Sequence, residues 1–110
     1  MRTFLHKELA DGRWFQLSLL EQLGNIGSEV SRARLSQGKD AGRFQNAVDR
    51  ALELFDLTLD DPRWNGRKQE IARAREVFCD VVTERNEYHS SLEDLDTYFL
   101  QFAFAARKYL

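Results

Sequence analysis

The sequence has little of the material that β-rich and disulfide-bonded domains require. It contains one proline, one cysteine and six glycines among 110 residues. So few turn-forming residues disfavour a small β-sandwich or barrel, because those folds need many tight turns. The single cysteine, Cys79, cannot form an internal disulfide. Its apolar neighbours Phe78, Val81 and Val82 predict a reduced, buried thiol.

The sequence also has no run long enough to span a membrane and little net charge, and we expect no secretion signal. Nothing approaches the roughly 20 apolar residues of a transmembrane helix. Polar and charged residues at positions 6–8 interrupt the apolar stretch that a signal peptide would need. The formal net charge of −2 gives no global attraction to nucleic acid or anionic lipid. We therefore expect a cytoplasmic protein with no membrane partner, in which any binding of nucleic acid is local.

What the sequence does contain is helical periodicity. Apolar residues recur every three or four positions in four segments, which are Leu19 to Ala33, Phe44 to Leu59, Ile71 to Val81 and Leu92 to Tyr109. This spacing is typical of amphipathic α-helices, and no segment alternates for long enough to indicate a strand. With 43% hydrophobic and 31% charged residues, the chain is large enough for one domain with its own core. The sequence predicts a single all-α domain over residues 1–110.

Short breaks separate these segments. Gly38 follows the first segment, an Asp-Pro pair at 61–62 follows the second, and the Ser-Ser-Leu-Glu run at 90–93 fits a capping box that opens the fourth. Short connections make sequential helices antiparallel neighbours. We therefore expect an antiparallel up-down four-helix bundle with an additional N-terminal helical segment. Residues 1–12 either extend the first helix or form a separate turn that breaks at Asp-Gly 11–12.

In such a bundle, basic residues gather at the ends. One end collects Arg32, Arg34, Lys39 and Arg43 and faces the loop before the fourth helix, whereas the middle of the second helix is acidic. Two interpretations stay open. The charges are solvated and form ion pairs within the helices, or the basic residues bind nucleic acid through its phosphates.

The loop before the fourth helix holds the most suggestive local cluster, residues 85–89 with the sequence Arg-Asn-Glu-Tyr-His. An arginine near a histidine could bind a phosphodiester and move a proton, because histidine has the side-chain pKa closest to neutral. The cluster resembles the signature of HEPN domains, all-α bundles that include RNases and partners of nucleotidyltransferases. The gap from arginine to histidine is shorter here than in that signature. The resemblance implies catalytic roles for Arg85 and His89, and a polar loop leading into a helix cap is the alternative.

Carboxylates offer a metal-dependent alternative. Glu53 and Asp56 share a face of the second helix, and Glu76 and Asp80 could lie on the neighbouring one. Carboxylates from facing helices can hold Mg²⁺ beside a nucleotide phosphate, as in all-α nucleoside triphosphate pyrophosphohydrolases. The first helix lacks the correctly spaced glutamate pair of that family, so we expect neither a metal nor another cofactor.

The fourth helix departs most from what a solitary bundle needs. Across residues 98–106 the only polar side chain besides the tyrosine is Gln101. Because successive helical residues turn by about 100°, this run is apolar nearly all the way round, whereas an outer helix should keep a polar face. Either the N-terminal segment encloses it, or it packs against another chain. The predicted interface residues are Tyr98, Leu100, Ala103 and Phe104.

Gly24 and Gly27 lie within one turn of each other in the first helix. A glycine inside a helix costs about 1 kcal/mol relative to alanine. The pair therefore indicates either a close approach or kink of the helices, or a backbone surface kept clear for a partner.

Three runs, at residues 4–15, 23–30 and 50–58, resemble an uncharacterised family of short bacterial helical-bundle proteins, and that likeness implies no activity. More loosely, the layout is similar to bundles that serve reverse transcriptases in diversity-generating retroelements and to ribosomal intervening-sequence proteins. Those bundles are oligomeric, and the retroelement proteins bind nucleic acid with basic surfaces.

The leading expectation is a non-enzymatic bundle that forms a homo-oligomer, or docks on a protein partner, through its last helix. Such a bundle would suit a bacterial nucleic-acid-linked module. The alternatives are a HEPN-like RNase or nucleotidyltransferase partner, and an RNA- or DNA-binding accessory bundle that uses its basic ends.

Overall fold

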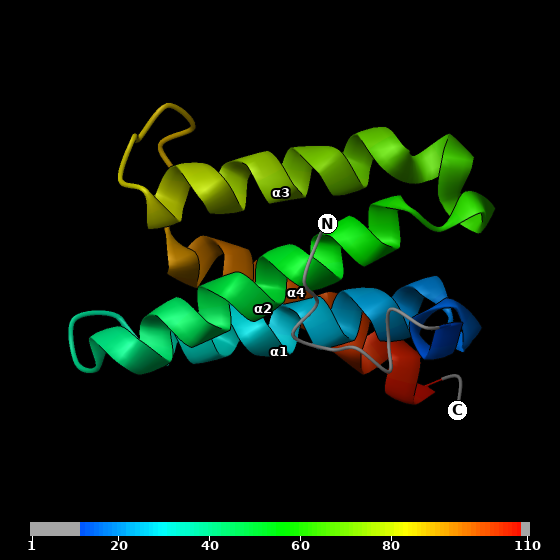
Figure 1. Cartoon of the computed structure of the whole chain (residues 1–110), viewed down its shortest axis with the longest axis horizontal. Coiled ribbons are helices and arrows are strands. Elements are labelled where there is room, and N and C mark those ends of the chain that lie inside the picture. Colours follow the sequence, from blue (N-terminus) through cyan, green and yellow to red (C-terminus); the bar gives the residue numbers. More distant parts are fainter. Residues whose placement is uncertain (1–11, 109–110) are drawn as a thin grey trace.

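The structure is a computed structural model that describes residues 12–108, and its four α-helices run up, down, up and down (Figure 1). The helices are α1 (Leu19–Ser36), α2 (Ala41–Leu59), α3 (Lys68–Val82) and α4 (Leu92–Lys108). Two short 3-10 helices, η2 (Trp14–Gln16) and η3 (Pro62–Arg67), precede α1 and α3. The described residues contain no β-strand. The predicted all-α antiparallel four-helix bundle is confirmed.

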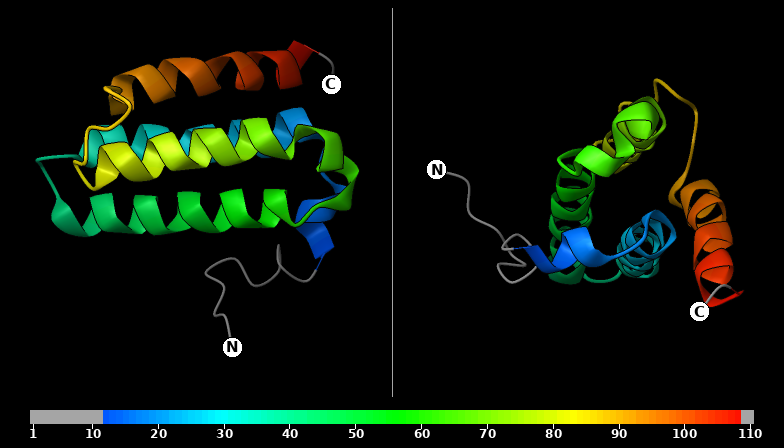
Figure 2. Two further views of the ribbon diagram at one scale, coloured as in Figure 1. Left: turned by 90° about the horizontal axis from the view of Figure 1, so that it is seen from above. Right: turned by 90° about the vertical axis from the view of Figure 1, so that its right-hand side faces the viewer.

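The four helices do not contact one another equally. α1 packs along α2 on one side and along α4 on the other, whereas α3 packs mainly on α2 and meets α4 only loosely. The end-on view in Figure 2 shows α3 and α4 set apart across the bundle. α1 is therefore the central helix, and the side between α3 and α4 is the most open.

The centre of the core is aromatic. The ring of Phe55 on α2 lies 5.9 Å from the ring of Phe78 on α3 and 5.9 Å from the ring of Phe99 on α4. All three side chains are fully buried. Each belongs to the apolar stripe that the sequence predicts for its helix, and the stripe of the first helix is buried from Leu19 to Ala33. Tyr109, the last member of the fourth stripe, lies outside the described residues.

Helix ends follow the predicted breaks with one shift. α1 ends at Ser36, and Gly38 then adopts a φ of +75°, a conformation that glycine tolerates. At the start of α4, the Ser91 hydroxyl accepts a hydrogen bond from the Asp94 amide (3.1 Å), and the Asp94 carboxylate accepts one from the Ser91 amide (3.2 Å). The capping box therefore begins one residue later than the predicted run at 90–93, with aspartate in the glutamate position.

α1 begins at Leu19 and does not continue back through residues 12–17, whereas the predicted segment before residue 12 lies outside the described residues. Ser18 caps α1, because its hydroxyl accepts from the Glu21 amide while the Glu21 carboxylate accepts from the Ser18 amide. The 3-10 helix η2 lies before this cap and buries Trp14. The predicted break at residues 11–12 falls at the edge of the described chain. None of the described helices is long and apolar enough to cross a lipid bilayer.

Gly24 and Gly27 face α4. Their backbone lies against Ala103 and Phe99 of that helix. The paired glycines therefore serve a close approach between α1 and α4, which is the first of the two explanations that the sequence allows.

Candidate functional site

The outer face of α4 carries a line of exposed residues with heptad spacing. The members of this α4 stripe are Glu93, Thr97, Leu100, Phe104 and Arg107, at intervals of four, three, four and three residues. Leu100 and Phe104 keep 51% and 58% of their surface exposed. A large apolar side chain at both central positions of an exposed heptad line is typical of a helix that pairs with another helix.

Charge divides the α4 stripe into an acidic end and a basic end. Glu93 lies in the first turn of α4 and Arg107 in the last. Each charge is opposite in sign to the partial charge of the helix terminus beside it. This arrangement stabilises α4 by about 0.3–1 kcal/mol per charged residue. The stripe therefore runs from negative through apolar to positive along the helix.

The other two predicted interface residues lie elsewhere on α4. Ala103 packs against Gly24 of α1. Tyr98 is half-buried, with its ring 5.2 Å from that of Phe99, and its hydroxyl donates a hydrogen bond to Glu70 (3.3 Å). Burial raises the pKa of the Tyr98 phenol above its ordinary value, and the nearby Glu70 carboxylate adds to the rise. Of the four predicted interface residues, Leu100 and Phe104 are the two that lie on the outer face of α4.

Tyr98 also lines a groove between α3 and α4. The groove has a volume of about 310 Å³, and its apolar wall is formed by Ala74, Val77, Leu95 and Tyr98. It exists because α3 and α4 meet only loosely. The groove between α3 and α4 is therefore lined mainly by apolar side chains.

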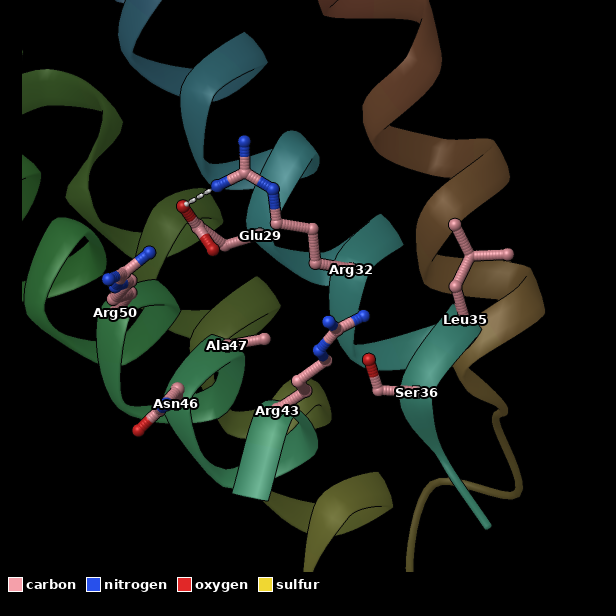
Figure 3. A pocket seen from close by; sticks show the side chains of 8 residues that line it. All are labelled: Glu29, Arg32, Leu35, Ser36, Arg43, Asn46, Ala47 and Arg50. Atoms are coloured by element: carbon pink, nitrogen blue, oxygen red, sulfur yellow. Dashed lines mark hydrogen bonds and ion pairs between the residues drawn. The ribbon is translucent and has the colours of Figure 1, made fainter. Parts of the chain in front are cut away.

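A second groove, of about 410 Å³, lies between α1 and α2 (Figure 3). Its polar lining comes from one face of each helix, and each face has residues spaced by three and four positions. The polar lining residues are Glu29, Arg32 and Ser36 of α1 and Arg43, Asn46 and Arg50 of α2. Figure 3 shows Arg32 and Arg43 reaching over the groove and the Glu29 carboxylate pointing from α1 towards α2.

Glu29 has the least usual environment in this groove. The residue is 6% exposed. Its Oε1 accepts a hydrogen bond from Nη1 of Arg32 (2.7 Å), whereas its buried Oε2 has no hydrogen-bond partner among the described residues. A buried carboxylate oxygen without a partner is costly, because it loses its hydration and gains nothing in return.

The structure separates the basic residues that the sequence predicts to act together. Arg32 and Arg43 line the α1–α2 groove. Arg34 instead pairs with Asp96 of α4 (2.6 Å), and Lys39 lies in the turn between α1 and α2. Arg50 joins the groove unpredicted, although its position seven residues after Arg43 places both on one face of a helix.

Ion pairs also occupy other basic residues of the bundle. Arg63 pairs with Asp61 (2.7 Å), and Arg67 pairs with Glu70 (3.1 Å). Arg43 also lies 3.5 Å from Asp40, but both side chains are exposed, so that pair is weak. These pairs favour the interpretation of solvated, ion-paired faces over broad basic surfaces, with the α1–α2 groove as the exception.

Arg85 and His89 are both exposed, in the loop between α3 and α4. The buried Asp80 carboxylate holds this loop, because it accepts hydrogen bonds from the amides of Glu87 (2.9 Å) and Tyr88 (3.1 Å). His89 has a φ of +51°, a left-handed conformation at the end of the loop. The catalytic roles that the HEPN resemblance implies for Arg85 and His89 stay a prediction.

The carboxylates considered for a metal site have protein partners. Asp56 pairs with Arg75 (2.9 Å), Glu76 accepts a hydrogen bond from the Tyr88 hydroxyl (2.9 Å), and Asp80 holds the loop. Within residues 12–108, no three histidine, cysteine or acidic side chains lie close enough together to hold a metal ion.

A buried polar cluster that the sequence analysis missed centres on Gln22. Its amide nitrogen donates to the Trp14 carbonyl (3.0 Å) and to Oδ2 of Asp61 (3.1 Å), and its amide oxygen accepts from Nε1 of Trp64 (2.8 Å). The Trp14 indole in turn donates to the hydroxyl of Thr58 (3.1 Å). The only trace of this cluster in the sequence is a glutamine beside the apolar stripe of α1.

Asp61 completes the cluster. The residue is 1% exposed, and the Arg63 guanidinium contacts both of its carboxylate oxygens. Hydrogen bonds from Arg63 lower the pKa of the Asp61 carboxyl below its ordinary value, although burial opposes them. Arg63 also donates to the Leu17 carbonyl (2.6 Å). Because the cluster satisfies its own polar groups and ties η2 and η3 to α1 and α2, it stabilises the fold and offers no site.

Comparisons with protein families, with curated proteins and with solved structures found no match to the chain. The resemblances suggested by the sequence therefore stay predictions, and the arrangement of the side chains carries the functional argument.

Proposed function

We propose that the chain is a non-enzymatic helical-bundle protein that self-associates, with α4 of one copy packing antiparallel against α4 of a second. The observation that supports this proposal is the α4 stripe. Leu100 and Phe104 are exposed at its centre, between an acidic residue at one end and a basic residue at the other.

The charges of the stripe favour a second copy in antiparallel orientation. Glu93 lies seven residues before Leu100, and Arg107 lies seven residues after it. A twofold axis at Leu100 therefore brings Glu93 of each copy opposite Arg107 of the other, so both ends of the interface are complementary. A parallel pairing would instead place like charges together, which is unfavourable.

The apolar side chains of the stripe supply only part of the free energy that a dimer needs. Complete burial of a leucine or phenylalanine side chain is worth about 1.5–3 kcal/mol, and each copy already buries about half of Leu100 and Phe104. Two copies supply four such half-exposed side chains, and association has an entropic cost of several kcal/mol. Together these four half-exposed side chains supply about 3–6 kcal/mol, so the flanking charges and the rest of the interface must supply the remainder, and we expect a weak, reversible dimer.

Sedimentation velocity over a series of protein concentrations, up to the highest at which the protein stays dissolved, tests this proposal. The wild type should shift from monomer to dimer, and Leu100→Glu or Phe104→Glu should stay monomeric. Leu35→Glu is the matched control, because Leu35 is 55% exposed but lies on α1, outside the stripe. This control should dimerise like the wild type.

A wild-type protein that stays monomeric throughout would contradict self-association and would leave docking of α4 on a different protein as the alternative. Dimerisation that survives both Leu100→Glu and Phe104→Glu would place the interface elsewhere on the bundle.

A further inference from the structure

The groove between α1 and α2 is independent of the α4 stripe and has the features of a ligand site. Its lining combines three guanidinium groups, from Arg32, Arg43 and Arg50, with the carboxylate of Glu29. Its volume of about 410 Å³ lies in the range of small-molecule sites. These four charged side chains come from two neighbouring helices, α1 and α2.

The environment of Glu29 indicates that the ligand carries a hydrogen-bond donor. Its Oε2 is buried and has no hydrogen-bond partner among the described residues, and Figure 3 shows the carboxylate directed at the groove. Arg32 bonds only to Oε1, and its side chain is 61% exposed, so its outward N–H groups face away from Glu29. A hydroxyl group that enters the groove would donate the hydrogen bond that Oε2 lacks, and bonds to a charged acceptor are among the stronger ones.

The three arginines of the groove indicate that the ligand also carries an anionic group. Three guanidinium groups and one carboxylate leave the groove with a net charge of +2. A phosphate monoester, which carries nearly two negative charges at neutral pH, balances that excess. Guanidinium groups also match phosphate geometry with paired hydrogen bonds. An amino acid would satisfy Glu29 with its ammonium group but would leave the positive charge of the groove uncompensated.

We propose that the α1–α2 groove binds a phosphorylated sugar. The phosphate contacts Arg43 and Arg50 and the outward N–H groups of Arg32, and a sugar hydroxyl donates to Oε2 of Glu29. A free sugar phosphate and a nucleotide share this chemistry, and the experiment below distinguishes them.

Isothermal titration calorimetry with ribose 5-phosphate, inorganic phosphate and adenosine 5′-monophosphate tests the proposal. In the wild type, ribose 5-phosphate should bind about tenfold more tightly than inorganic phosphate, because only the sugar reaches Glu29. Glu29→Met keeps the side-chain volume and removes the acceptor, so it should abolish this difference. Adenosine monophosphate binding more tightly than ribose 5-phosphate would identify a nucleotide site, and equal binding would identify a sugar-phosphate site.

Substitutions of the cations provide the second arm. Arg43→Ala and Arg50→Ala should each weaken both phosphate compounds about tenfold or more. Arg67→Ala is the control, because Arg67 is exposed, pairs with Glu70 and does not line the groove. The absence of binding by all three compounds, equal binding of ribose 5-phosphate and inorganic phosphate to the wild type, or unchanged affinity in both groove variants would each overturn the proposal.

Discussion

The side chain of Phe99 rests against the backbone of Gly27, so closely that a Cβ atom on Gly27 would lie 2.7 Å from the Cβ of Phe99. Such a separation is much shorter than the optimal van der Waals distance between two carbon atoms, which is about 3.5 Å or more. One turn away, a Cβ on Gly24 would lie 3.5 Å from the Cα of Ala103. The two glycines are alike in the sequence but differ in how much space their neighbours leave.

This difference predicts opposite effects of alanine at the two positions. Gly27→Ala should lower the free energy of unfolding by about 2 kcal/mol, because the new methyl group forces α4 away from α1. Gly24→Ala should be neutral or raise it by up to about 1 kcal/mol, since the methyl group fits and alanine favours the helix. Urea unfolding followed by circular dichroism measures both, and an equally stable Gly27→Ala protein would contradict the close approach of the helices.

The antiparallel pairing of two α4 helices predicts a charge-reversal rescue. Glu93→Arg alone and Arg107→Glu alone should each weaken dimerisation, because each places like charges at both ends of the interface. The double variant restores opposite charges across the twofold axis and should regain most of the wild-type affinity. Sedimentation measures the Kd, and circular dichroism checks that α4 remains helical. A double variant that dimerises no better than either single variant would argue against this geometry.

Asp61 predicts a pH-dependent contribution to stability. Hydrogen bonds from Arg63 lower the pKa of the Asp61 carboxyl in the folded protein. The stabilisation is therefore fully present above the ordinary aspartate pKa of about 3.9 and is lost as the pH falls through the lowered, folded-state value. Asp61→Asn should be less stable than the wild type by about 2 kcal/mol at pH 7, and this gap should narrow in strongly acidic solution.

Urea unfolding of both proteins at pH 7, 5 and 3 follows that gap, at values that span the aspartate titration. Asp49→Asn is the control, because Asp49 is exposed on α2. A stability difference for Asp61→Asn that does not change with pH would show that the lowered pKa contributes nothing.

Two buried polar residues of α1 should respond oppositely to methionine. Glu29→Met should leave the free energy of unfolding unchanged or raise it by about 1 kcal/mol, because it removes an oxygen without a partner and frees an exposed Arg32 to meet water. Gln22→Met should lower it by about 2–4 kcal/mol, because it removes hydrogen bonds from the buried Asp61 carboxylate and the half-buried Trp64 indole. Thermal unfolding of the pair provides the comparison, and a loss of stability in Glu29→Met would show that its carboxylate is satisfied.

Periodicity alone predicts the helices and their inward faces, because a stripe such as Leu19 to Ala33 repeats over several turns. It cannot reveal the cluster at Gln22. The partners Asp61 and Trp64 lie 39 and 42 residues further along the chain, and their hydrogen bonds form only after α1 and α2 have packed. A single polar residue at a core position does not reveal which residues will form its hydrogen bonds.

The candidate sites were predictable in kind but not in detail. Composition indicates an apolar outer face on α4, yet the position of α1 decides that Leu100 faces outward while Ala103 faces Gly24. Similarly, Arg32 and Arg34 are two positions apart, which turns their side chains about 200° from each other around the helix. Arg34 therefore reaches Asp96 of α4, whereas Arg32 faces the α1–α2 groove.

The loose contact between α3 and α4 has a consequence for how the protein opens. α1, α2 and α4 form a connected unit through the central helix, and α3 joins it chiefly through α2. The least costly partial unfolding therefore swings α3 outward and uncovers Phe55 while the rest stays folded. Amide protons of α3 should accordingly exchange with solvent through an excursion that those of α1 do not share.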